Sequence, residues 1–252
     1  MDNLIALSGY QIKLLMRNAK SLILGFSLPI AMFFIFSNLL GGYTVGEGMA
    51  IIDLLIPAYL PIIIVNGVLV IYGQTFLQYK EQGNLLKFKL LGISGLTVSS
   101  GLYVATFLFQ IAASLLLVAF AVVLKGMTLP YQSLPAIAVV FLLINAYQFA
   151  LVYVLTSIIH KSVTYQAVSQ LLFYYQIFLG GLTFPPEMFP DFLHKFVYLF
   201  NPIVYGLEMM RGVWAGTGSL LNYGKEAAIL LGVSVVMIAV GVWMQRRSNK
   251  MA

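Results

Sequence analysis

Long apolar stretches follow one another along most of this chain, and few charges interrupt them. A helix of about 20 mainly apolar residues is long enough to cross the hydrocarbon core of a bilayer. Hydrophobic residues make up 61% of the 252 residues and charged residues only 9%, whereas a soluble domain carries roughly a quarter. So few charges cannot cover a surface in water. The sequence therefore predicts an integral membrane protein of the all-α class.

Six of these stretches have the length of a membrane span. They cover about 22–40, 51–73, 97–124, 134–159, 163–183 and 227–245. At about 20 residues each they use half of the chain, so residues 1–252 are predicted to form a single membrane domain with no soluble catalytic domain. The first apolar run follows a basic stretch and lacks a small-residue cleavage site, so no cleavable signal peptide is expected.

A basic amphipathic segment, residues 4–20, precedes the first span. Lys13, Arg17 and Lys20 share one helical face, and leucines gather on the opposite face. This pattern favours a helix that lies in the headgroup region of the membrane. A frayed basic N-terminus is the alternative.

The cations are distributed unequally between the two sides of the predicted spans. With both termini in the cytosol, ten Lys and Arg residues fall on the inner side and four on the outer side. Cytosolic loops are the ones enriched in cations, so this topology is favoured. The net charge of +6 therefore indicates orientation in a lipid membrane and not a nucleic-acid partner.

Motifs for chemistry are missing from the sequence. It contains no Walker sequence, no H-E-x-x-H and no cysteine, and its two histidines, His160 and His194, fall near opposite faces of the membrane. We expect no catalytic residue, no metal ligand and no cofactor bound by this chain. A membrane-embedded enzyme is disfavoured for this reason. A secondary carrier is disfavoured because acids inside the spans are scarce, with Asp53 alone at the edge of one, and because no repeat between the two halves is found. A non-transporting sensor or anchor subunit stays an alternative.

The inner segment 80–93 mixes cations with bulky apolar residues. A short helix that docks into a groove of a partner protein uses apolar anchors of this kind, and a helix lying on the inner membrane surface fits equally well. The residues expected to act in such docking are Glu81, Gly83, Leu85, Leu86, Lys87 and Phe88.

The outer stretch 180–212 is too apolar for a hydrated loop and too interrupted by proline for one span. Two short helices, 186–199 and 202–212, are predicted to dip into the outer leaflet and to meet near Asn201, which is expected to cap the second helix. Glu208 and Arg211 have the spacing of a pair on one helix. The predicted outer gate comprises Pro186, Pro190, Asn201, Pro202, Glu208 and Arg211.

Polar side chains inside the second and fifth spans are expected to face protein or water instead of lipid. Those selected as a candidate substrate path are Tyr59, Asn66, Gln166, Gln170 and Tyr174. Hydrogen bonding between helices, with no substrate contact, is the alternative reading of the same residues.

Taken in order, these features resemble a known family. A basic N-terminal helix, six spans, an inner E-x-G loop and a G-L-x-F-P-x-x-x-x-P…N-P…Y-x-x-E-x-x-R stretch look like the membrane permease subunit of ABC type 2 exporters, which include drug, antimicrobial-peptide and polysaccharide exporters. The family often has a Pro-Ile-Ser-like turn after the inner segment, where this chain has Leu91-Gly92-Ile93-Ser94.

The resemblance implies a bacterial plasma-membrane exporter. In that family the 80–93 segment is a coupling helix in a cleft of a separate ATPase subunit, which holds the ATP and magnesium. The 186–212 pair closes the outer end of the path, and the second and fifth spans lie around a central cavity between two permease chains, identical or merely similar.

Overall fold

The computed structural model of the chain describes residues 9, 13, 19–40, 44–45, 49–181, 189–216 and 219–251. Over these residues the chain is almost entirely helical, as the composition predicts. The exceptions are the two-residue strands β1 (Thr44–Val45) and β2 (Met49–Ala50), which pair antiparallel. Most of the predicted interfacial helix 4–20 falls outside the described residues.

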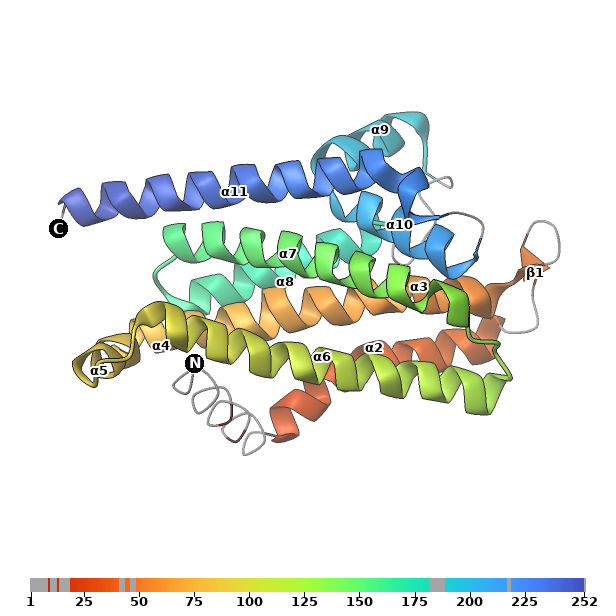
Figure 1. Cartoon of the computed structure of the whole chain (residues 1–252), viewed down its shortest axis with the longest axis horizontal. Helices are drawn as coiled ribbons and strands as arrows, with labels where there is room; N and C mark the ends of the chain where they lie inside the picture. Colours follow the sequence, from red (N-terminus) through yellow and green to blue (C-terminus); the bar gives the residue numbers. More distant parts are fainter. Residues whose placement is uncertain are drawn as a thin grey trace.

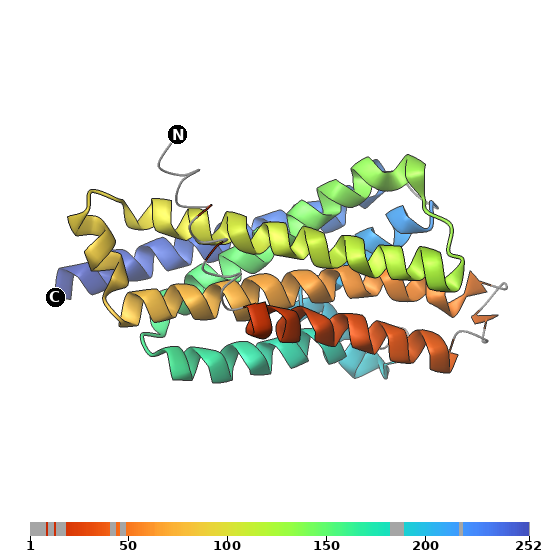
Figure 2. The same cartoon turned by 90° about the horizontal axis from the view of Figure 1, so that it is seen from below.

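The longer helices run side by side along the long axis of the molecule (Figures 1 and 2). In chain order the helices are α2 (Ala19–Leu40), α3 (Ile51–Val65), the π-helix η1 (Asn66–Tyr72), α4 (Gly73–Glu81), α5 (Asn84–Leu90), α6 (Gly95–Lys125), α7 (Leu134–Ile158), α8 (Ser162–Leu179), α9 (Asp191–Phe200), α10 (Ile203–Trp214) and α11 (Gly224–Met251). The short 3-10 turns η2 (Tyr131–Ser133) and η4 (Leu220–Tyr223) precede α7 and α11.

Four helices in the described part are long and apolar enough to cross a membrane. They cover Leu55–Glu81, Gly95–Lys125, Tyr131–Ile158 and Leu220–Arg247, and they match the second, third, fourth and sixth predicted spans. The first and fifth spans stay predictions: α2 contributes the shorter apolar helix Pro29–Leu39, and the 18-residue α8 contains three glutamines. The second helix also continues to Glu81, well beyond the predicted end near residue 73.

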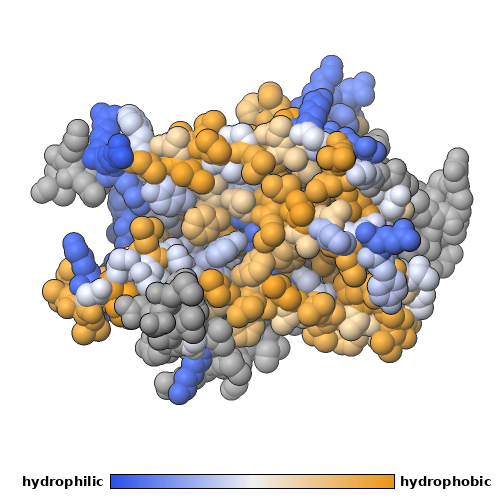
Figure 3. All heavy atoms as spheres, viewed as in Figure 1, coloured by the Kyte–Doolittle hydropathy of each residue, from blue (hydrophilic) through white to orange (hydrophobic). Residues whose placement is uncertain are grey.

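The helices differ in how much of their apolar surface the chain itself covers. The most apolar window of the α3–η1–α4 helix is 83% buried, against 22% for α6 and 17% for α11. The α3–η1–α4 helix therefore forms the centre of the bundle, whereas α6 and α11 present apolar side chains outward. Figure 3 shows the result as a broad hydrophobic middle with hydrophilic residues gathered at both ends, which is the surface that a bilayer solvates.

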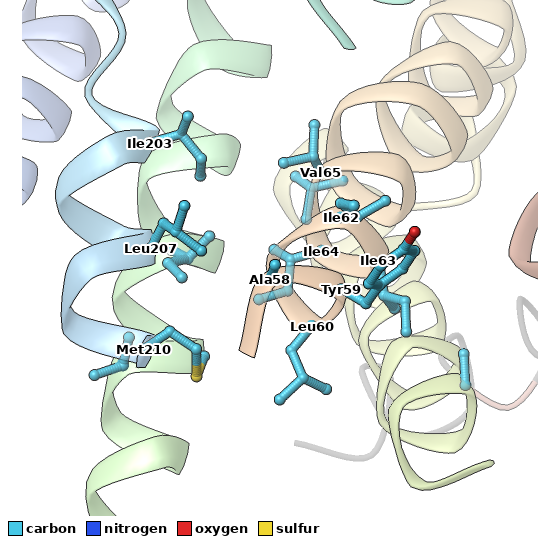
Figure 4. Packing of buried hydrophobic residues seen from close by; sticks show 14 of the residues in the cluster. Ala58, Tyr59, Leu60, Ile62, Ile63, Ile64, Val65, Ile203, Leu207 and Met210 are labelled. Atoms are coloured by element: carbon cyan, nitrogen blue, oxygen red, sulfur yellow. The ribbon is translucent and has the colours of Figure 1, made fainter. Parts of the chain in front are cut away.

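Helix α10 packs into the same core from the outer stretch. Its Ile203, Leu207 and Met210 are fully buried, and Figure 4 shows them facing the side chains of α3, among them Ala58. Gly206 lets α10 approach α7 closely, because a Cβ at this position would lie 2.8 Å from the Ile144 side chain on α7. The 203–214 segment is thus part of the body of the domain.

Two groups of elements lie at opposite ends of the bundle. Helix α5 and the C-terminal end of α11 lie at one end, and β1, α9 and α10 lie at the other (Figure 1). The predicted inner segment 80–93 and the predicted outer stretch are therefore separated by the length of the bundle.

Candidate functional site

The inner segment folds as a helix between two tight turns. Helix α4 ends at Glu81, Gly83 turns the chain with a φ of +70°, and α5 follows over Asn84–Leu90. Gly92, with a φ of +75°, makes the second turn, a left-handed conformation that glycine adopts without strain. The side chain of Ser94 then accepts a hydrogen bond from the amide of Thr97 (3.1 Å) and caps α6.

Apolar side chains of this segment are left uncovered by the rest of the chain. Leu86, Leu90 and Leu91 are exposed, while Leu85 and Phe88 are half-buried. Lys87 is exposed beside them and donates to the side chain of Asn84 (3.3 Å). Exposed leucines on a helix at the end of a bundle are the anchors that a partner groove can bury.

Lys80 and Glu81 are exposed, and each bonds a backbone atom of another helix. Lys80 Nζ donates to the carbonyl of Thr156 (3.0 Å), close to the end of α7. Glu81 accepts a hydrogen bond from the amide of Ser162 (2.8 Å), the first residue of α8. A cation at a helix C-terminus and an anion at a helix N-terminus both complement the helix dipole, so this pair fastens α4 to the connection between α7 and α8. Glu81, selected from the sequence for docking, thus has a bonded partner within the chain.

The candidate path residues fall into two groups. On α8, Gln166 and Tyr174 are exposed and Gln170 is half-buried, so they form a polar strip on the outer surface of the helix. Tyr59 and Asn66 are buried within the chain instead, and Tyr59 packs edge-on against Phe33 of α2 with ring centroids 5.7 Å apart. The structure therefore does not bring the five residues onto one surface of a single chain.

The opposite face of α8 carries buried polar side chains. Gln148 of α7 donates to Gln176 of α8 (2.6 Å). Tyr165 donates to the backbone carbonyl of Leu69 in η1 (2.8 Å). These bonds link the fifth predicted span to its neighbours in the apolar core, where an unpaired polar group is costly.

Several buried polar residues were not selected from the sequence, among them Gln110 and Asn145. Gln110 on α6 is fully buried, and neither of its side-chain polar atoms has a hydrogen-bond partner among the described residues. Asn145 on α7 accepts a bond from Tyr103 (3.3 Å). The sequence could have indicated both residues, because a glutamine or asparagine inside an apolar stretch is expected to face protein or water.

The outer stretch forms two helices, α9 and α10, with boundaries within a few residues of those predicted from position 190 onward; Pro186 lies outside the described residues. The cap predicted for Asn201 is wrong. Asn201 ends α9, Pro202 is the residue before α10, and the α10 start has no side-chain cap. Both polar atoms of the Asn201 side chain are buried without a partner among the described residues. Backbone bonds begin the helix instead, from Val204 to the carbonyl of Asn201 (3.1 Å).

Polar contacts hold the two outer helices together. The Tyr198 hydroxyl on α9 donates to the carboxylate of Glu208 on α10, and the Tyr205 hydroxyl donates to the backbone carbonyl of Tyr198 (3.1 Å). Arg211 donates to the carbonyl of Gly181, just after α8 (2.9 Å). Burial raises the pKa of Tyr205, and the carboxylates of Glu208 and Glu226 raise it further. Tyr205 therefore stays a neutral donor at ordinary pH.

Comparison with known families identifies the membrane domain. The profile of the ABC-2 type transporter family matches residues 2–214, which run from the N-terminus to the last residue of α10. The chain belongs to the ABC-2 type transporter family. It is therefore a membrane permease component of an ABC transporter. ABC-2 membrane domains are generally non-catalytic and normally work with an ABC ATPase subunit. No curated protein gave a significant match to this ABC-2 chain.

Within the described residues, no three His, Cys, Asp or Glu side chains are grouped so that they could hold a metal ion. Three features of the ABC-2 chain are arranged along one axis (Figure 1). They are an exposed helix at one end, a central helix fastened to α8, and at the other end a pair of short helices of which α10 is buried.

Proposed function

We propose that this chain forms half of the substrate path of an ATP-driven exporter in a bacterial plasma membrane. Both termini and segment 80–93 face the cytosol, and 41–50, 125–133 and 184–226 face outward. The observation that carries the proposal is the exposed leucine face of α5, at the end of the bundle opposite α9 and α10. An apolar helix face in water favours a partner, and in this family the usual partner is an ABC ATPase.

The ATPase cycle reaches the membrane through α4 in this proposal. Helix α5 follows α4 after the tight turn at Gly83. Lys80 and Glu81 fasten α4 to the backbone at the end of α7 and the start of α8. A displacement of α5 by the ATPase would thus move the start of α8 as well. ATP and magnesium belong to the ATPase subunit, and this chain binds neither.

A second permease chain, identical or similar, completes the path. The strip of Gln166, Gln170 and Tyr174 lies on the surface of a helix that runs along the bundle axis. Polar amides that face lipid are unfavourable, whereas a second chain or a water-filled path between two chains would satisfy them. Tyr59 and Asn66, buried in the single chain, reach such a path only if the helices move apart. Helices α9 and α10 close its outer end.

Charge substitution on α5 tests the docking. Burying one leucine contributes about 1.5–3 kcal/mol, and a carboxylate in its place must also be desolvated. Leu86→Asp and Leu90→Asp should each lower the affinity for the ATPase subunit about tenfold or more. Leu221→Asp is the matched control, since Leu221 is at least as exposed but lies in η4, just before α11.

The measurement is the amount of ATPase that copurifies with each full-length variant in nanodiscs, together with the rate of ATP hydrolysis by the assembled complex. Thermal unfolding of the permease reports whether the fold is intact. Unchanged ATPase binding and unchanged ATP hydrolysis in both α5 variants would show that α5 is not the docking element.

A further inference from the structure

The helix at the centre of the bundle contains a change of hydrogen-bond register. In η1 the amides bond the carbonyl five residues earlier, whereas an α-helix uses the fourth. The amide of Gly73, at the end of η1, accordingly bonds the carbonyl of Val68. In an α-helix the same amide would donate its hydrogen bond to the carbonyl of Leu69. The π register therefore takes this donor away from Leu69.

Tyr165 on α8 supplies a donor to that carbonyl. Its hydroxyl lies 2.8 Å from the Leu69 oxygen, and the whole side chain is buried. A buried carbonyl is costly to leave unpaired, so this bond stabilises the π register at the point where the register loses its own donor. Gly73 makes room for the hydroxyl, because a Cβ there would lie 1.8 Å from the Tyr165 oxygen.

Tyr72, the buried tyrosine at the end of η1 itself, has a different role. The Tyr72 hydroxyl bonds the side chain of Ser99 on α6 (2.7 Å) and touches no backbone group of η1 in that bond. Tyr72 is as deeply buried as Tyr165. The two tyrosines thus offer a matched pair: both make a buried hydroxyl bond between helices, but only that of Tyr165 depends on the register.

We propose that Tyr165 is a positioning residue that holds η1 in the π register, and that η1 converts to an α register when the Tyr165–Leu69 bond opens. At the Leu69 carbonyl the conversion exchanges one donor for another, from the Tyr165 hydroxyl to the Gly73 amide. This carbonyl therefore has a donor in both registers, and the α register lacks only the bond from Tyr165. The π-helix encloses one residue more in each hydrogen-bonded turn than an α-helix does. A return to the α register therefore rotates α4 and α5 by about 100° and shifts them by about 1.5 Å relative to α3.

The rotation can be detected with one thiol. The chain has no cysteine of its own, and Leu77 on α4 is fully buried. Leu77→Cys in the full chain in nanodiscs should react slowly with N-ethylmaleimide while η1 keeps the π register. Adding Tyr165→Phe should raise the reaction rate tenfold or more, because a rotated α4 turns residue 77 out of its packing.

Two further variants separate the register from general loosening. Gly73→Ala displaces the Tyr165 hydroxyl from the side of α4 and should act like Tyr165→Phe. Tyr72→Phe deletes a buried hydroxyl of the same kind and should leave the rate within twofold of the parent. An unchanged rate in Tyr165→Phe, or an equal rise in Tyr72→Phe, overturns the inference.

The use of this joint in coupling rests on the proposed function and has its own measurement. In the complex with its ATPase, trapping with ATP and vanadate should change the labelling of Leu77→Cys, and Tyr165→Phe should abolish that change. If the isolated chain behaves as expected but nucleotide has no effect, the register joint stands and its link to ATP is wrong. If the complex assembles and hydrolyses ATP but Tyr165→Phe has no effect on labelling, the proposed function stands and the joint is wrong.

Discussion

Helices α9 and α10 follow one another in the chain and have 10 and 12 residues, yet they have opposite relations to the core. Leu207 and its neighbours on α10 are fully buried between α3, α7 and α11, whereas on α9 Phe192 is 75% and Leu199 is 72% exposed. Each helix is about half as long as a membrane span. A short helix is stable at depth only where protein covers it, and the chain covers α10 alone.

The two helices also differ in their sequences in a way that fits this contrast. Helix α10 has glycines where neighbours approach: a Cβ at Gly206 would lie 2.8 Å from Ile144, and one at Gly212 would overlap the Tyr223 hydroxyl. Helix α9 has no glycine and carries three phenylalanines, with Phe196 and Phe200 in ring contact at 4.8 Å. Small residues let α10 enter the bundle, and bulky ones keep α9 at its surface.

Truncating one leucine in each helix should give the largest difference between α9 and α10. Leu207→Ala leaves a cavity in the core and should lower the unfolding free energy by about 2–5 kcal/mol. Leu199→Ala removes the same atoms from an exposed site and should change it by less than about 0.5 kcal/mol. Denaturation of the two variants in matched lipid nanodiscs measures both. Equal losses would mean that α9 is covered as fully as α10, for instance by a second chain.

Deleting the Tyr198 hydroxyl should detach α9 without disturbing α10. A hydrogen bond to a charged group contributes about 1.5–3 kcal/mol, and the bond from Tyr198 to Glu208 joins the two helices. In Tyr198→Phe, hydrogen exchange should become faster over 191–200 and stay unchanged over 203–214. Tyr153→Phe is the control, because its hydroxyl bonds Gln245 and lies away from both helices. Faster exchange across α10 as well would show that the pair is one cooperative unit.

Asn201→Ala should have the smallest effect. Its side chain does not cap α10 and has no hydrogen-bond partner among the described residues. No hydrogen bond seen there is lost, so the unfolding free energy should change by less than about 0.5 kcal/mol. Ser94→Ala is the positive control: its side chain does cap α6, and its loss should cost about 1 kcal/mol. A loss of that size in Asn201→Ala would restore the cap predicted from the sequence.

The sequence predicts the apolar architecture well because span length and proline position are local properties. The two outer helices follow from Pro190 and Pro202, and α6, α7 and α11 follow from uninterrupted apolar runs. The sequence cannot predict the π register at 66–72, because the bond that supports it comes from Tyr165, 96 positions beyond Leu69.

For the candidate site, the sequence predicts which residues avoid lipid but not which residues they contact. Polar residues in an apolar span must face protein or water, and the sequence identified Asn66 and Gln166 on that basis. It could not tell that Asn66 is covered by its own chain while Gln166 is exposed, because that depends on which helices neighbour each other. The cap at Asn201 failed for a similar reason, since the preceding helix continues up to this residue and fixes its backbone.

The pair Lys80–Glu81 bonds backbone atoms of its partners, the carbonyl of residue 156 and the amide of residue 162. Every amino acid has the first atom and every one except proline has the second. Substitutions at 156 and 162 can therefore accumulate over evolution without breaking the two bonds, but no change at those positions can compensate for the loss of Lys80 or Glu81. Among descendants of this chain, the side chains at positions 156 and 162 can change, whereas Lys80 and Glu81 must be kept.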